Sequence, residues 1–91
     1  MDDFLTYLSK NLSNVEFTEE YIDDEELLKM LAKSITSARN EAHMTQYELS
    51  KVTNIQQGTI SKIENGNYNL TINMLERIAK GLGKKIIIRF E

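Results

Sequence analysis

Apolar side chains recur at intervals of three and four residues over most of the chain, and this spacing predicts helices. The first predicted helix covers residues 2–12, with an aspartate at its start. A longer helix is predicted over about 24–42, and a last helix begins at Thr71 and stops at Gly83. The residues expected to face inward are Phe4, Leu5, Leu8 and Leu12 in the first helix, Leu27, Leu31, Ile35, Ala38 and Ala42 in the second, and Ile72, Leu75, Ile78 and Leu82 in the last.

Between positions 45 and 66 the pattern predicts two short helices joined by a tight turn. Thr45 and Glu48 have the spacing of a capping box, which marks the start of the first short helix. Asn54 is the non-glycine residue best suited to a left-handed turn, so the chain can reverse there. The apolar residues expected to bury the first short helix are Leu49 and Val52.

The second short helix, about Gln56–Glu64, is expected to bury Ile60 and Ile63 and to turn a polar face outward. Glutamine can pair with adenine, lysine can donate to guanine or phosphate, and threonine offers a hydroxyl and a methyl, so such side chains can read bases. Polar residues on a helix are commonly only solvated. Here the preceding helix and turn favour the interpretation that these side chains contact base edges in the major groove of DNA. The outward residues are Gln56, Gln57, Thr59 and Lys62.

This stretch resembles the lambda-repressor-like helix-turn-helix domain, also called the Xre or Cro/C1 type, over about residues 27–83. The shared pattern is Thr-Gln-x-Glu-Leu-Ser, then Ile-Ser-Lys-Ile-Glu-Asn-Gly, then Leu-x-x-Ile-Ala-Lys-x-Leu-Gly. The resemblance implies a partly buried, structural ion pair between Arg39 and Glu64. It implies base contacts from Gln57, Thr59 and Lys62, with Gln56 beside them, and phosphate contacts from Gln46, Asn65 and the backbone of Gly66.

Two further residues are candidates for contact with the DNA backbone. Tyr68 lies in the loop after the second short helix, where it can either contact phosphate or cover the core. Lys51 can at most touch the backbone. Three positions depart from the family pattern: Gly58 weakens the recognition helix, Gln56 replaces the usual Ser or Thr cap, and Leu70 replaces a common proline.

The 91 residues suffice for one compact domain with a modest core and an appended arm. With no cysteine, the chain has neither disulfides nor thiolate metal sites, and without a signal sequence or long apolar run it is expected to be cytoplasmic. The net charge of −3 is unevenly divided, since residues 1–30 carry nine acids and two bases, whereas residues 31–91 carry five acids and nine bases. The basic part suits phosphate, so the acidic part needs another partner.

Four consecutive acids, Asp23–Glu26, open the long helix. They can act as caps and solvated charges at the helix N-terminus, or as a docking surface for a basic partner. A carboxylate metal site is a third, less favoured interpretation, because no histidine accompanies the acids. The sole histidine, His43, lies at the end of the long helix, where contact with the helix dipole explains it. No cofactor is expected, and nothing indicates an enzyme.

The C-terminal segment 84–91 is rich in large, partly β-branched residues and predicts one short strand. A single strand cannot pair within its own chain, so it is expected to pair with the same strand of a second copy or to join a partner's sheet. The expected dimer contacts are Ile86, Ile87, Ile88 and Phe90. The sequence therefore predicts an all-α helix-turn-helix bundle in three parts: a helical N-terminal arm (1–22), a DNA-binding domain (23–83) and a C-terminal strand (84–91).

The Glu-Phe-x-x-Glu-Tyr segment of the arm, the domain and the Lys-Ile-x-Ile-x-Phe tail together resemble the HigA-type antitoxins of bacterial type II toxin–antitoxin pairs. This resemblance implies a protein that neutralises a basic HigB-type messenger-RNA-cleaving toxin and, as a homodimer, binds operator DNA to repress its own operon. Phe17 and Tyr21 are also expected to anchor the arm on the domain. The alternatives are a prophage-type repressor without a toxin and an interaction module that has lost DNA binding. The expected toxin contacts are Phe4, Leu5, Leu8, Leu12, Phe17, Tyr21, Asp23 and Asp24.

Overall fold

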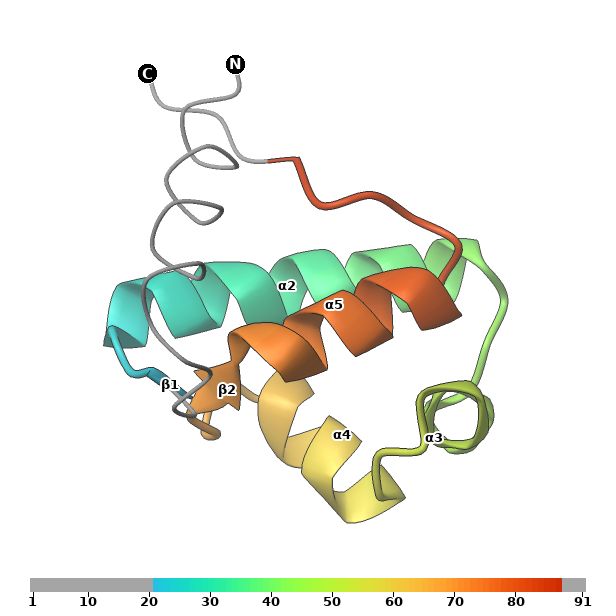
Figure 1. Cartoon of the computed structure of the whole chain (residues 1–91), viewed down its shortest axis with the longest axis horizontal. Helices are drawn as coiled ribbons and strands as arrows, with labels where there is room; N and C mark the ends of the chain where they lie inside the picture. Colours follow the sequence, from blue (N-terminus) through green and yellow to red (C-terminus); the bar gives the residue numbers. More distant parts are fainter. Residues whose placement is uncertain (1–20, 88–91) are drawn as a thin grey trace.

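The computed structural model describes residues 21–87, and the helix predicted over 2–12 lies outside the described residues. Figure 1 shows α2 and α5 extending across the molecule, with α4 and α3 together below them. This part of the chain is a helical bundle, as the sequence predicts. In chain order its elements are β1 (Tyr21–Ile22), α2 (Glu25–Glu41), α3 (Gln46–Thr53), α4 (Gln57–Glu64), β2 (Leu70–Thr71) and α5 (Ile72–Gly81).

Three of the described helices begin at a side-chain cap that the sequence predicts. Asp24 caps α2, and Thr71 caps α5 without help from a preceding proline. At α3 the capping box is complete: the Thr45 hydroxyl accepts the Glu48 amide at 3.0 Å, and the Glu48 carboxylate accepts the Thr45 amide at 2.8 Å. Because each cap satisfies backbone donors that would otherwise lack a partner, these residues determine where the helices start.

His43 has a backbone role that the sequence does not show. Its φ is 56°, so the histidine itself supplies the left-handed residue after α2, and its amide donates to the Asn40 carbonyl at 3.0 Å. Such a residue ends a helix and redirects the chain. The imidazole is exposed, and the turn at His43 leads the chain toward α3.

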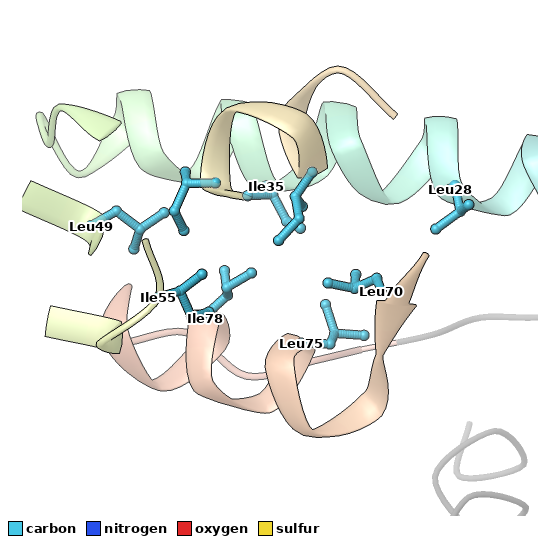
Figure 2. Packing of buried hydrophobic residues seen from close by; sticks show 9 residues of the cluster. Leu28, Ile35, Leu49, Ile55, Leu70, Leu75 and Ile78 are labelled. Carbon is cyan, nitrogen blue, oxygen red and sulfur yellow. The ribbon is translucent and has the colours of Figure 1, made fainter. Parts of the chain in front are cut away.

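The core lies between α2 and α5, and Figure 2 shows side chains from both helices meeting there. The side chains of Leu49 and Ile60 are completely enclosed. Burying one such side chain contributes about 1.5–3 kcal/mol, so this cluster is the main source of stability. Its members are Leu28, Ile35, Leu49, Ile55, Ile60, Ile63, Leu70, Leu75 and Ile78.

The predicted inward face of α2 is partly wrong. Periodicity cannot choose between neighbouring stripes that share the same spacing of three and four residues. The choice comes from packing, because α4 lies against α2 and selects the face that becomes buried. The buried residues are Leu28, Ala32 and Ile35, whereas the expected Leu27, Leu31 and Ala38 are half-buried and Ala42 is exposed.

The prediction that Val52 is buried is also wrong, since its side chain is 57% exposed. Thr53 is buried in its place, with 5% exposure. The Thr53 hydroxyl donates to the Leu49 carbonyl at 2.7 Å, which removes the cost of burying a polar group. α5 covers this side of α3 at Gly81, where an added Cβ would lie 2.8 Å from Thr53 Cγ2.

The structure places its strands elsewhere than the sequence predicts. β1 and β2 pair in antiparallel register, with Tyr21 opposite Thr71 and Ile22 opposite Leu70. Of the two expected anchors, Phe17 lies outside the described residues, and the role of Tyr21 is wrong, because its side chain is 54% exposed and Ile22 packs against the core instead. Period two along a strand makes neighbouring residues point to opposite faces, so only one of Tyr21 and Ile22 can be the anchor.

The predicted C-terminal strand has no counterpart in the described segment 84–87, which is irregular. Ile86 packs against the core, and Ile87 is 69% exposed. The other two expected dimer contacts, Ile88 and Phe90, lie outside the described residues.

Candidate nucleic-acid interface

The turn between α3 and α4 spans only three residues. Asn54 adopts the predicted left-handed conformation, with φ 59° and ψ 32°, and Ile55 buries its side chain in the core. Gln56 makes no side-chain cap, but its carbonyl accepts the amides of Thr59 and Ile60, both at 3.0 Å, and so starts α4. The short turn and the buried Ile55 set the direction in which α4 leaves α3.

The outward face of α4 presents the side chains expected to read bases. Gln56, Gln57 and Lys62 are exposed and Thr59 is half-buried, while the two isoleucines of the helix enter the core. A Cβ at Gly58 would meet no atom within 4 Å, so the first turn of this face is open. The solvent-accessible part of α4 and its cap residue therefore offers two amides, a hydroxyl and an ammonium, the groups that major-groove base edges can pair with.

The C-terminal end of α4 is tied to α2 by the predicted ion pair. Arg39 Nε lies 2.7 Å from Glu64 Oε2, and Nη2 lies 3.0 Å from Oε1, so the contact is bidentate. Arg39 Nη1 also donates to the Met44 carbonyl at 2.7 Å, which holds the loop before α3. The pair joins α2 to α4, holds the loop before α3 and so fixes the C-terminal end of α4.

Both members of this pair have shifted pKa values. The hydrogen bond to Glu64 raises the pKa of Arg39. At Glu64 burial acts to raise the pKa, but the hydrogen bonds from Arg39 and Gln46 outweigh burial and hold the pKa below its usual value. The carboxylate is therefore ionised wherever the protein is near neutral pH.

Gln46 and Gly66 have intramolecular partners in addition to the phosphate contacts expected of them. Gln46 Nε2 donates to Glu64 Oε1 at 3.1 Å. The Gly66 amide donates to the Ile63 carbonyl at 3.0 Å, and its φ of 75° explains why glycine follows α4. Gly66 therefore serves as the helix stop, and its phosphate contact stays a prediction. Asn65 is exposed, and its phosphate contact stays a prediction, as does that of Gln46.

Tyr68 and Lys51 are the other two candidates for backbone contact. Tyr68 is half-buried and packs against the core, which supports the covering role of the two that its position allows. Lys51 is exposed, and its ammonium lies 5.1 Å from the centroid of the Tyr47 ring. This cation–π geometry keeps the charge on the outer surface of α3.

Arg77 of α5 is a residue that the sequence did not single out. Its guanidinium donates to the carbonyls of Thr53 and Asn54, at distances of 2.8 to 3.2 Å. Nothing in the local spacing marks this contact, since the two carbonyls belong to residues 24 and 23 positions earlier. The turn before α4 is therefore held by a helix that follows it in the chain.

The acids that open α2 are exposed, and Asp24 has the capping role expected of it. Within residues 21–87, no group of three or more His, Asp or Glu side chains is placed to hold a metal ion, so the metal interpretation gains no support. Over the same residues, none of the helices has the length and apolar character needed to cross a membrane.

Comparison with known proteins gives the family. Residues 35–87 match the helix-turn-helix family HTH_3. The chain is 29% identical over 72 residues to an uncharacterised HTH-type transcriptional regulator of Haemophilus influenzae, which covers 79% of this chain and 74% of that relative.

Solved structures of one protein resemble this fold closely. The wild-type restriction–modification controller protein C.Esp1396I superposes with a TM-score of 0.66 at 39% identity, over 68% of this chain and 82% of that chain. The C.Esp1396I tetramer in complex with its natural 35-base-pair operator gives a TM-score of 0.65 at 39% identity, over 68% and 82% of the two chains. C.Esp1396I bound to a 19-base-pair DNA duplex gives a TM-score of 0.63 at 41% identity, over 65% of this chain and 79% of that chain.

These similarities agree with the geometry of α3 and α4. They confirm the Xre or lambda-repressor-like domain that the sequence pattern indicates, and the relatives are regulators rather than enzymes. The acid-rich residues 1–30 precede the matched segment. The chain belongs to the HTH_3 helix-turn-helix family and is a DNA-binding transcriptional regulator.

Proposed function

We propose that this regulator binds operator DNA as a homodimer to repress its own operon, and that it also neutralises a basic HigB-type ribonuclease toxin. The observation that carries the DNA-binding part is the exposed polar face of α4 beside the three-residue turn. The operator complex of C.Esp1396I, a protein 39% identical over 68% of this chain, supports the same mode of binding. This role would place the protein in the cytoplasm with the DNA.

In this proposal Gln57 reads a base from the N-terminal end of α4, where a recognition helix enters the major groove. Thr59 and Lys62 contribute further base contacts, with Gln56 at the edge. Lys51 and Asn65 supply phosphate contacts, which set the register of the domain on the duplex without reading sequence. Two copies related by a two-fold axis would present two such helices to half-sites about one helical turn apart.

A groove of about 510 Å³ between α2 and α5 supports the dimer contact at the C-terminal end. Ile87 lies at this groove, is 69% exposed and leads directly into the remaining predicted dimer residues. A second copy that covers this apolar surface would remove it from water, which would stabilise a dimer. The apolar side chains that line the groove include Leu31, Ile35, Leu75, Ile78, Leu82 and Ile86.

The toxin-binding part rests on the division of charge. Nine of the fourteen acids lie in residues 1–30, and none of these nine falls within the segment shared with the family. A ribonuclease needs a basic surface to hold RNA, so an acidic arm would be attracted to it and would compete with RNA. In this proposal Tyr21, whose side chain is 54% exposed, supplies an aromatic contact for the toxin.

If a small basic protein is encoded next to this gene, titration calorimetry with that protein tests the toxin partnership. We expect tight binding by the full chain and weaker binding by a chain that lacks residues 1–20, which retains β1 and the core contact of Ile22. DNA binding is the control, because the shortened chain keeps the core and α4 and should bind operator as before. Unchanged affinity for the toxin after truncation would show that the acidic N-terminal arm does not bind the toxin. Absence of any complex would contradict the toxin partnership itself.

A stand-alone regulator without a toxin is the second candidate. The identity of 39–41% to C.Esp1396I, a restriction–modification controller, favours it. In that case the acidic arm would only limit non-specific binding to DNA. Co-purification from the native host separates the two candidates, because only the first predicts a basic protein bound in stoichiometric amounts.

A further inference from the structure

α4 carries the base-reading face but has weak local support at its start. Gln56 provides no side-chain cap, and Gly58 lowers the helix propensity of the first turn. A side chain such as Gln57 can be aimed at a base only if the residues around it hold one conformation. The turn over residues 54–56 must therefore be held by another element.

Arg77 of α5 supplies this support. Its Nε and Nη2 donate to the Thr53 carbonyl at 3.2 and 2.8 Å, and Nη2 also donates to the Asn54 carbonyl at 2.9 Å. Thr53 ends α3 and Asn54 is the left-handed residue of the turn, so the positive guanidinium lies at the negative end of the α3 dipole. The arginine is half-buried, which strengthens these bonds relative to bonds exposed to water.

Gly81 brings α5 close enough for this contact. It lies one helical turn after Arg77 and therefore on the same face of α5. An added Cβ would lie 2.8 Å from Thr53 Cγ2 and 3.0 Å from Val52 Cγ2. Both atoms are methyls of β-branched side chains, whose rotamers are restricted, so α3 itself would have to move. Close approach at Gly81 and hydrogen bonding at Arg77 thus act on the same end of α3.

We propose that Arg77 is a positioning residue for base recognition: it fixes the turn that presents Gln57, and so contributes to sequence specificity without reading a base. The inference rests on the proposed function of α4. Without the guanidinium the turn gains freedom, and the oriented contact between Gln57 and a base weakens. Phosphate contacts tolerate such displacement better, so non-specific binding should persist.

The test compares R77M with K80M in the full-length protein. Both variants lose one positive charge from α5 and keep a long apolar stem, but Lys80 is exposed. The probes are a duplex selected from a random library by the unmodified protein and a scrambled duplex of the same composition. Fluorescence anisotropy at several salt concentrations measures both affinities. For R77M we expect the specificity ratio, the affinity for the selected duplex divided by the affinity for the scrambled duplex, to fall about tenfold. Its affinity for the scrambled duplex, and the dependence of that affinity on salt concentration, should equal those of K80M.

Each other outcome contradicts a stated step. A ratio in R77M as high as in K80M would show that Arg77 does not position Gln57. An equal loss on both duplexes, with a salt slope lower by about one unit, would make Arg77 a phosphate contact. Failure of the unmodified protein to select any duplex would overturn the proposed function itself, which distinguishes that failure from the failure of this inference.

Two further variants separate positioning from folding. R77K keeps the charge but lacks the planar fork that reaches both carbonyls, so it should keep scrambled affinity without restoring the full ratio. G81A displaces α5 from α3 and should lower the ratio although Arg77 is intact. The Ile55 amide, bonded to the Thr53 hydroxyl at 3.3 Å, should exchange faster with solvent in both. If R77M does not fold, R77K and G81A decide the test: the proposal is overturned if both keep the ratio of selected-duplex to scrambled-duplex affinity of the unmodified protein.

Discussion

Replacing Arg39 by methionine is expected to destabilise the protein by about 3–5 kcal/mol, because it removes one partner of an enclosed ion pair. The side chains of Arg39 and Glu64 are only 13% and 5% exposed. Methionine fills much of the volume of the arginine stem, but it removes both bonds to the Glu64 carboxylate and the bond to the Met44 carbonyl. Since small domains are stable by about 5–15 kcal/mol, this loss is a large part of the total.

Urea unfolding of the full-length protein, followed by circular dichroism at pH 7, measures this effect. The matched control is K84M, which also removes the base of an ion pair. Lys84 Nζ lies 3.6 Å from Glu41 Oε1, but the two side chains are 51% and 70% exposed. Such a surface pair contributes about 0–1 kcal/mol. A loss in R39M no larger than the loss in K84M would refute the reasoning that burial makes the first pair important.

The same ion pair makes stability depend on pH. The pKa of Glu64 in the folded protein lies below its ordinary value of 4.5, so the stabilisation is fully present above pH 4.5 and is lost as the pH falls through the lower, folded pKa. In E64Q this acid-dependent loss should be smaller. Unfolding curves between pH 7 and the acid limit measure it, and identical pH dependence in both proteins would assign the acid sensitivity to other carboxylates.

Three further predictions concern α3, α4 and the C-terminal tail. Gln57→Ala should lose about 1–3 kcal/mol of binding free energy on the operator and little on scrambled DNA, whereas Lys51→Ala should weaken binding to both and lower the salt slope by about one unit. Anisotropy titrations measure both affinities, and equal losses on the two duplexes for Gln57→Ala would show that α4 does not read bases. A chain that ends at Gly83 should dimerise less and bind operator more weakly through lost avidity; light scattering checks this, and an undiminished dimer would place the contact elsewhere, for example on α5. Gly58→Ala should stabilise the protein by about 0.5–1 kcal/mol, since the new Cβ has open space and helix propensity rises; a fall in the urea midpoint would contradict this.

Features that depend on residues close together in the chain can be predicted from the sequence alone. The capping box of Thr45 and Glu48, the caps at Asp24 and Thr71 and the left-handed turn at Asn54 all follow from contacts within four residues. The outward face of α4 follows in the same way, because helical spacing separates its isoleucines from its polar side chains. The Arg39–Glu64 pair is a long-range contact, and in the sequence only the resemblance to a family implies it.

Contacts between elements that are distant in the chain depend on how the helices pack in three dimensions. Packing of α4 chose Leu28 over Leu27 as a buried residue of α2, although both stripes have helical spacing. The approach of α5 buried Thr53 and left Val52 exposed, and it brought Arg77 to the carbonyls before α4. Local patterns report which faces of a helix are apolar, but the choice among them depends on which neighbour can approach most closely and satisfy the buried polar groups.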